Sequence, residues 1–237
     1  MSYNYTIYGT NGRDYYDLDY SYDNYTAYLL KEEDTIYLGE GSDTVYGAAG
    51  NDYISLGGGN EPAYGGDAHD TIVGGYGYDS LHGELGNDRI YARDYDSTDY
   101  VYGDAGRDYI EVDSDVVFAG PDNDTVSVTD AFDGASINLG AGADTLRVHF
   151  NARYDPVYVN DFKAEDHLFL TRTGYTNAQV LDILDSNNDG WLGAKDGDSN
   201  GAWGVNVDVA GNDLELWVDG NELELNGMTK ASFDFLS

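Results

Sequence analysis

The chain has 237 residues, no cysteine, and a formal charge of −34 at pH 7 from 45 acidic against 11 basic residues. This charge opposes binding to nucleic acid and to anionic membranes, and the lack of cysteine excludes disulfides. A hydrophobic content of 41% nevertheless predicts a folded core rather than a disordered acidic chain.

The main feature of the sequence is an acidic residue that returns about every nine positions, with a mostly apolar residue two positions after it. The acids are Asp14, Asp23, Asp34, Asp43, Asp52, Glu61, Asp70, Asp79, Asp88, Asp99, Asp108, Asp115, Asp124, Asp133 and Asp144. Of the fourteen steps between them, ten are nine residues, three are eleven and one is seven, so every departure is two residues. Because side chains on a strand alternate between its faces, such departures keep the apolar column on one face.

The clearest unit, residues 83–91, reads Gly-Glu-Leu-Gly-Asn-Asp-Arg-Ile-Tyr and matches the nonapeptide Gly-Gly-x-Gly-x-Asp-x-U-x, where U is apolar. We number the unit 1 to 9, so the acid is position 6 and U is position 8. Glycines let the turn bend tightly and direct carbonyl oxygens inward, and with the acid they form an oxygen-only site suited to calcium. Three residues remain for a strand, and we expect only U to face inward. One unit cannot bury this face alone, so the units must stack as coils of a parallel β-roll.

Two units per coil would separate the acids into two columns along the roll. The first edge carries Asp14, Asp34, Asp52, Asp70, Asp88, Asp108, Asp124 and Asp144, and the second edge carries Asp23, Asp43, Glu61, Asp79, Asp99, Asp115 and Asp133. The ions would lie between stacked turns, and we expect the strongest sites around residues 38–108. The expected ligands are Gly39, Gly41, Asp43, Gly47, Gly50, Asp52, Gly57, Gly59, Glu61, Gly65, Asp67, Asp70, Gly75, Gly77, Asp79, Gly83, Gly86, Asp88, Gly103, Gly106, Asp108, Asp124, Gly140, Gly142 and Asp144.

Some turns depart from this pattern. Residues 29–34, 94–99 and 128–133 lack the glycines, and we expect these turns to be empty of calcium. Glu61 replaces aspartate and precedes Pro62, which weakens the prediction of a site there.

The nonapeptides, over about residues 9–147, resemble those of the RTX family, the hemolysin-type calcium-binding repeats of bacterial proteins exported by type I secretion. Residues 157–170 look like the strand pair that follows such repeats, and residues 231–237 are similar to the short acidic and apolar ends of these proteins. The resemblance implies a two-sheet parallel roll, an uncleaved C-terminal export signal and folding outside the cell on meeting calcium. The start of the chain, which lacks the basic and apolar parts of a signal peptide, fits that route.

A different calcium motif follows the repeats. Residues 177–184 read as a short helix leading into Asp185-Ser-Asn-Asn-Asp-Gly-Trp-Leu-Gly-Ala-Lys-Asp196, which is similar to an EF-hand loop. Asp185, Asn187 and Asp189 would provide side-chain oxygens, Trp191 its carbonyl, and Asp196 the last carboxylate in place of the usual glutamate. A plain acidic turn is the alternative, and an overlapping loop at residues 196–201 is a second candidate.

The end of the chain alternates apolar and polar residues. The apolar positions are Val205, Val207, Val209, Leu214, Leu216, Val218, Leu223 and Leu225, and they predict antiparallel hairpins that cap the roll. The expected fold is therefore all-β: a right-handed parallel β-roll over residues 1–150, and a capping region over residues 151–237 with β-hairpins, a short helix, the EF-hand-like loop and the export signal.

Enzyme motifs are missing from the sequence: we find no His-Glu-x-x-His, no Gly-x-Ser-x-Gly and no Walker loop. We expect His69 and His82, at variable repeat positions, to be surface residues. Tyrosines flanking U should project outward, Tyr15, Tyr37, Tyr53, Tyr91 and Tyr109 on one sheet and Tyr46, Tyr64, Tyr100 and Tyr102 on the other. They either pack across strands or form an aromatic platform for a glycan or partner protein.

These observations predict a secreted, non-catalytic protein whose roll folds when several Ca²⁺ ions bind between stacked turns. The alternative is a carbohydrate-binding or surface-attachment module that uses the tyrosine faces. The expected partners are calcium ions and the type I secretion machinery, with a glycan or surface protein in the second case, and no segment is long and apolar enough to span a membrane.

Overall fold

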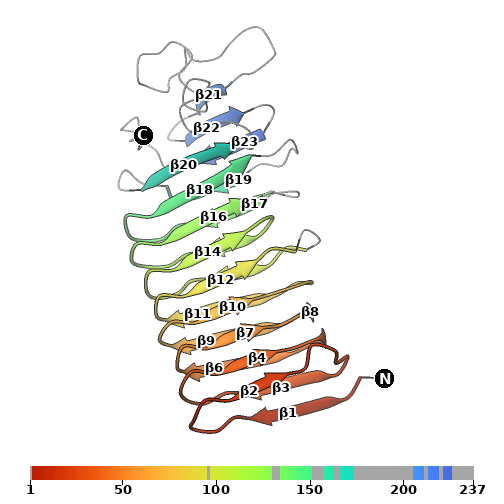
Figure 1. The fold of residues 1–237 in the computed structure, drawn as a ribbon. Coiled ribbons are helices and arrows are strands. Elements are labelled where there is room, and N and C mark those ends of the chain that lie inside the picture. The colour runs from red at the N-terminus through yellow and green to blue at the C-terminus, as the bar shows by residue number, and fades with distance from the viewer. Residues whose placement is uncertain are drawn as a thin grey trace.

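The computed structural model describes residues 2–94, 97–129, 134–150, 157–162, 166–172, 205–210, 213–218 and 221–225. Within these ranges every regular element is a strand and none is a helix. The chain winds into a solenoid of about eight coils, with the N-terminus at one end of the stack and strands β21 to β23 at the other (Figure 1). The predicted parallel β-roll is therefore confirmed.

Each coil contributes one strand to each of two main sheets. Sheet 1 has 12 strands in the order β1 (Asn4–Tyr8), β3 (Asn24–Tyr28), β6 (Thr44–Ala49), β9 (Pro62–Asp67), β11 (Ser80–Leu85), β13 (Tyr100–Tyr102), β15 (Val116–Phe118), β17 (Ala135–Asn138), β19 (Val157–Val159), β23 (Asn221–Leu225), β22 (Asp213–Val218) and β21 (Val205–Ala210). Sheet 2 has nine strands, β2 (Tyr15–Asp17), β4 (Thr35–Tyr37), β7 (Tyr53–Ser55), β10 (Thr71–Val73), β12 (Arg89–Ala92), β14 (Tyr109–Val112), β16 (Thr125–Thr129), β18 (Thr145–Phe150) and β20 (His167–Arg172). A short pair, β5 (Glu40–Gly41) and β8 (Gly58–Gly59), links two turns.

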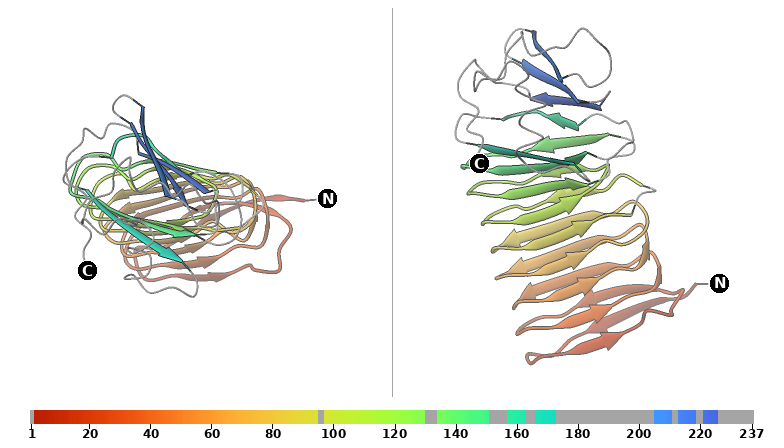
Figure 2. Two further views of the ribbon diagram at one scale, coloured as in Figure 1. Left: turned by 90° about the horizontal axis from the view of Figure 1, so that it is seen from above. Right: turned by 45° about the horizontal axis from the view of Figure 1, so that its top comes forward.

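The apolar core lies between the two sheets, which face each other when the roll is viewed along its axis (Figure 2). The parallel register places each U residue over the U residue of the next coil, as in Ile54 over Ile72 and Ile72 over Ile90. All three side chains are fully buried. The nine-residue pattern thus produces one continuous column per sheet.

The expectation that only U faces inward was too narrow. The residue two places after U, at position 1 of the next turn, is also buried in most turns where it is large, and Leu18 is partly buried. The buried residues are Leu29, Leu38, Leu56, Val112, Val128, Leu139 and Val148. Side chains alternate with period two, so the inward face continues into the turn.

The assigned register of the second edge was wrong at both ends, by two residues each time. Ala27, and not Tyr25, pairs with Val45 in the U column, so Asp23 lies outside the acidic column. Ile137, and not Ala135, pairs with Val117 in the U column. Ala135 therefore stands at position 6, where the sequence had predicted the acid Asp133. A two-residue shift preserves the buried face, which is why the pattern of apolar residues did not reveal it.

Past residue 150 the roll continues, because β19 pairs with β17 and β20 pairs with β18, both parallel. The predicted C-terminal hairpins are confirmed: β21 pairs antiparallel with β22, and β22 with β23. β23 also joins β19, so these strands extend sheet 1. The predicted helix at 177–184, the EF-hand-like loop at 185–196, the overlapping loop at 196–201 and the export signal at 231–237 lie outside the described residues.

Across the described ranges, the structure contains no helix with the length and hydropathy of a membrane span.

Candidate metal centre

The acids at position 6 are linked from coil to coil by hydrogen bonds. The backbone N–H of each acid donates to Oδ1 of the acid in the next coil. On the first edge these bonds are Asp34 to Asp52 at 2.7 Å, Asp52 to Asp70, Asp70 to Asp88 and Asp88 to Asp108 at 2.8 Å, and Asp108 to Asp124 and Asp124 to Asp144 at 2.9 Å. On the second edge they are Glu61 to Asp79 at 2.9 Å, and Asp79 to Asp99 and Asp99 to Asp115 at 2.8 Å. The first edge therefore carries a continuous acidic ladder from Asp34 to Asp144, and the second edge carries one from Glu61 to Asp115.

The second carboxyl oxygen of these acids is buried and has no hydrogen-bond partner in the protein. This holds for Oδ2 of Asp34, Asp43, Asp52, Asp70, Asp88, Asp99, Asp108 and Asp124. A buried, unpaired carboxylate oxygen is costly, since an ionised group loses its hydration and gains nothing in return. Eight repetitions of this arrangement indicate an oxygen-binding cation as the missing partner.

Burial also changes the ionisation of the ladder. It raises the pKa of Asp52 and Asp88 to about 6 and that of Asp70 and Asp108 to about 7, against the lowering effect of the backbone hydrogen bond that each accepts. For Glu61, burial and then the neighbouring Asp79 carboxyl raise the pKa well above its usual range. Without a cation, the folded ladder therefore favours protons on its carboxyls.

Glycine at position 1 makes room for the ladder carboxylate within its own turn. A Cβ built on Gly103 would lie 2.7 Å from Asp108 Oδ2 and would also meet the carbonyl oxygen of Ala119. Glycine at position 4 lets successive turns approach each other. Gly86 and Gly106 have φ of 156° and 135°, and a Cβ on Gly106 would overlap the carbonyl oxygen of Gly86. The glycines thus bring backbone oxygens of adjacent coils together around the acids.

The turn at residues 29–34 keeps this conformation without glycine. Leu30 and Glu32, at positions 2 and 4, have φ of 85° and 67°, and Oδ2 of Asp34 is buried without a partner. The stacked neighbours therefore impose the left-handed backbone on residues that rarely adopt it. Lack of glycine alone did not abolish the ladder geometry here.

The second edge differs after Gly77. Ser97 Oγ donates to the Gly77 carbonyl oxygen at 2.7 Å, and the Gly77 N–H donates to Asp94 Oδ2 at 3.0 Å. The step from Asp88 to Asp99 is two residues longer than the usual nine. In this longer turn, the side chains of Asp94 and Ser97 bind the backbone N–H and carbonyl of Gly77. Whether the 94–99 turn is empty of calcium stays a prediction, because Asp99 Oδ2 is buried without a hydrogen-bond partner as in the other turns.

The donor set fits calcium. In the described ranges no three His, Cys, Asp or Glu side chains converge on one point, so a metal on the ladder must take most of its ligands from backbone carbonyls. Neighbouring coils lie about 4.8 Å apart, roughly twice the calcium–oxygen distance of about 2.3–2.6 Å. An ion between two turns can therefore contact oxygens from both, and hard oxygen ligands with no nitrogen or sulfur favour Ca²⁺ over transition metals.

Most residues predicted from the repeat lie in these turns. The acids at 43, 52, 61, 70, 79, 88, 108, 124 and 144 are buried on the ladders. The predicted glycines fall at position 1 (47, 65, 83, 103), position 2 (39, 57, 75, 140) and position 4 (41, 50, 59, 77, 86, 106, 142) of the same turns. Asp67, at position 3, is instead exposed, and its carbonyl accepts the Gly50 N–H.

Two features of the ladders were missed. Asp166 extends the first edge, accepting the Asp144 N–H at 3.0 Å, and its spacing to Leu168 repeats the acid-to-U signal. Asn51, Asn87 and His69, at position 5, form a second column of side chains. Asn51 Oδ1 accepts the His69 N–H at 3.0 Å, and His69 Nδ1 accepts the Asn87 N–H at 2.8 Å. His69 is a surface residue, as expected, but it also joins successive turns.

Comparison with protein families agrees with the geometry. A family model described as the RTX calcium-binding nonapeptide repeat (4 copies) matches residues 32–60, 64–94 and 95–126. The chain thus contains RTX calcium-binding nonapeptide repeats, and these form a parallel β-solenoid of the β-roll type. Such repeats bind Ca²⁺ and are typical of type I secreted bacterial proteins. No curated protein matches the chain.

Proposed function

We propose that this protein is a non-catalytic, secreted calcium-binding roll that folds when Ca²⁺ ions bind between successive turns of its two edges. The proposal depends above all on the eight buried Oδ2 atoms that have no partner in the protein. A cation bound between two coils would be coordinated by such an Oδ2 atom and by turn carbonyl oxygens from both coils. Most of the proposed ligands are the position 6 acids and turn glycines named from the repeat, and the loop at 185–196 is proposed as a further site.

Calcium would stabilise the fold through linkage. With site affinities of roughly 0.1 mM and about 1–2 mM calcium outside cells, each independent site adds about 1.4–1.8 kcal/mol. Without calcium, the ladders bring like charges together every coil in a chain of formal charge −34. A sum over several sites is of the same order as the whole stability of a domain, so binding can decide whether the roll is folded.

This linkage suits export. The acidic chain would stay unfolded at the low calcium concentration of the cytosol and fold at the higher concentration outside. On that basis we propose that this chain is secreted, as is typical of proteins with RTX repeats. The non-catalytic assignment is supported by the ladders themselves, because they occupy the buried acids that an acid–base mechanism would need.

The proposal is tested by titrating calcium into the chelator-treated full chain while recording far-ultraviolet circular dichroism. We expect a cooperative gain of β signal near millimolar calcium. Magnesium is the control, because its shorter bonds and strict octahedral shell fit the coil spacing poorly. Full β signal in chelator, or an equal response to magnesium, would refute calcium-driven folding.

On sheet 1, the alternative of a glycan platform on tyrosine faces loses support from the ring geometry. Tyr46 stacks on Tyr28 and Tyr64 with ring centroids 5.0 and 5.1 Å apart and planes within 4°. Stacked neighbours cover both faces of such a ring, so this column presents ring edges to solvent. Sugars bind aromatic residues through the ring face, and we therefore retain calcium-driven folding as the proposed function.

A further inference from the structure

A column of seven rings runs along sheet 1, one ring per coil, at the residue after U. Its members are Tyr8, Tyr28, Tyr46, Tyr64, His82, Tyr102 and Phe118, with centroids 4.4–5.5 Å apart. We call it the ring column. It ends at Phe118, because Asn138 occupies the corresponding position on β17.

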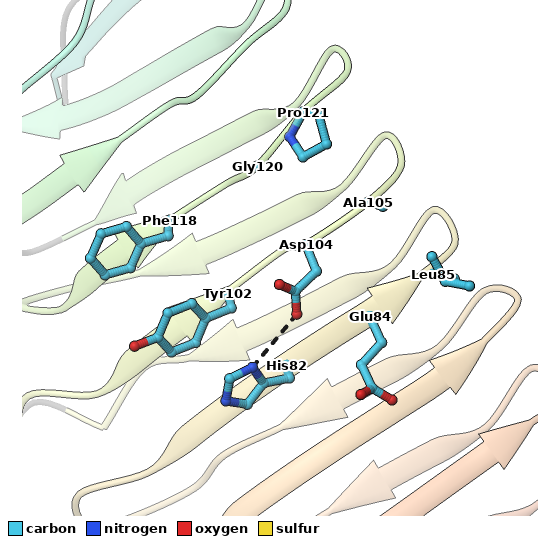
Figure 3. Close-up of a pocket in the computed structure, with 9 residues that line it drawn as sticks. All are labelled: His82, Glu84, Leu85, Tyr102, Asp104, Ala105, Phe118, Gly120 and Pro121. Carbon is cyan, nitrogen blue, oxygen red and sulfur yellow. Dashed lines mark ion pairs between the residues drawn. The ribbon is translucent and has the colours of Figure 1, made fainter.

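A groove follows the ring column over its last three members, and Figure 3 shows it in close-up. One wall consists of His82, Tyr102 and Phe118. The other wall consists of residues at positions 2 and 3 of three successive first-edge turns, among them Glu84, Leu85 and Asp104. The groove therefore runs along the roll axis, across three coils, beside the first-edge ladder, whose turns form its second wall.

The groove combines negative charge with apolar surface. Of its nine lining residues two are acidic and none is lysine or arginine. Glu84 is exposed, and the side chain of Asp104 is 42% exposed, with Oδ2 3.5 Å from His82 Nδ1. Leu85 is 57% exposed, and Ala105 and Pro121 continue the apolar side along the axis. A ligand that fits must be cationic and must also carry aliphatic surface.

These properties favour an extended ligand over smaller ones. Among the lining residues, a bare metal ion would find only the carboxylates of Glu84 and Asp104 as charged oxygen ligands. A sugar would need an open ring face. His82 and Tyr102 each have a stacked ring on both sides, so among the three lining rings only Phe118, the last of the column, lacks a ring on one side. A linear chain of ammonium groups and methylenes has the required charge and can follow the axial direction of the groove. Its methylenes can lie on Leu85 and the ring edges while its ammonium groups meet the carboxylates.

We propose that this groove binds linear polyamines along the roll axis, with Glu84 and Asp104 as the charged contacts and Leu85 as the main aliphatic contact. The acids stand on adjacent coils, about 4.8 Å apart by strand spacing. Both hold left-handed backbone, φ 70° and 64°, where the neighbouring turns have Gly66 and Gly120. The two acids stand in the same first-edge turns as the ladder, and the charge of Asp104 acts on Asp88 and Asp108, so binding requires that the roll be folded.

The test is isothermal titration calorimetry of spermidine into the calcium-loaded full chain. The double variant E84Q/D104N should bind about tenfold more weakly or worse, because two charge-assisted contacts are lost. The matched control, E32Q/E40Q, removes the same charge from exposed turn residues outside the groove and should stay within about twofold of the parent chain. Far-ultraviolet spectra in calcium establish that all variants keep the fold.

A second ligand separates aliphatic contact from bulk charge. Hexaamminecobalt(III) has the charge of spermidine but no methylene chain, so L85S should weaken spermidine binding and leave that of the cobalt complex unchanged. The proposal is overturned if spermidine does not bind, if both double variants weaken it equally, or if L85S affects neither ligand or both alike.

Discussion

The backbone N–H of Asp70 donates to Oδ1 of Asp88, 2.8 Å away in the next coil, and this leaves Asp88 Oδ2 buried without a protein partner. The two oxygens of one carboxylate thus make two different interactions. The first joins neighbouring coils, and the second is available to a cation. Substitutions that remove these interactions separately should have different effects.

Asp88→Asn keeps an Oδ1 acceptor but removes the charge, so it should raise the calcium midpoint of folding and leave the transition cooperative. Asp88→Ala also leaves the Asp70 N–H unpaired, which costs a further about 1–3 kcal/mol. Calcium titrations followed by circular dichroism measure both. Asp17→Asn, an exposed acid on β2, is the control, and a midpoint shift as large as that of Asp88→Asn would contradict a specific ladder site.

Gly106→Ala should destabilise the calcium-loaded roll by about 2–3 kcal/mol or more, because the new Cβ overlaps the Gly86 carbonyl oxygen and φ is 135°. Urea unfolding in saturating calcium provides the measurement. Gly12→Ala is a matched control, since its Cβ would meet only Thr10 Oγ1, at 3.8 Å. Equal effects of the two alanines would contradict the close approach of successive turns.

The calcium-free chain should gain structure on acidification. Burial raises the pKa of Asp43 and Asp88 to about 6, of Asp70 to about 7 and of Asp124 to about 8, above about 3.9 for an unfolded aspartate. A raised folded-state pKa favours the protonated fold, so its stabilising effect is complete below about pH 4 and is lost as pH rises through about 6 to 8.

Circular dichroism in chelator between pH 4 and 8 tests this directly, and the β signal should fall with rising pH. Calcium binds the ionised carboxyls, so its midpoint should rise as pH falls through the same window. A calcium-free β signal that increases from pH 5 to 8 would contradict the ladder electrostatics.

His82→Tyr should preserve the ring column, whereas His82→Ala should interrupt it between Tyr64 and Tyr102. Two stacked pairs at about 0.5–1.5 kcal/mol each predict a loss of about 1–3 kcal/mol for the alanine variant. Urea unfolding in calcium measures the loss. Tyr20→Ala, at a side chain that is 94% exposed, should cost little. A similar loss for the tyrosine and alanine variants would show that stacking is not the stabilising contact.

The repeat alone predicts the roll, its two edges and its buried column, because a nine-residue period with an alternating strand has few ways to bury its apolar face. It fails where the chain can shift by two residues without exposing that face. Asp23 has the nine-residue spacing but lies outside the acidic column, and Ala135 holds the acid position that the spacing had assigned to Asp133. Asp166 continues the column although the regular spacing has stopped. Hydrophobic alternation fixes which face is buried and not which rung a residue joins.

The conformation of the turns could be predicted only in part from the positions of glycine. Position 2 or 4 requires a left-handed backbone, which favours glycine, yet Leu30, Glu32 and Asp104 adopt it between well-stacked neighbours. Absence of glycine was therefore a weak sign of an empty turn. The ring column was also hidden, since nine-residue spacing showed outward tyrosines on each sheet but gave no orientation to their rings.

The ring column gives the roll an optical property. Parallel rings 5.0–5.1 Å apart, as at Tyr28, Tyr46 and Tyr64, couple their excited states, while all three tryptophans lie beyond residue 190. Near-ultraviolet circular dichroism in the tyrosine band should thus depend on how many consecutive coils are assembled. The tyrosine band thus reports the stacking of the coils, whereas tryptophan emission reports only the C-terminal region.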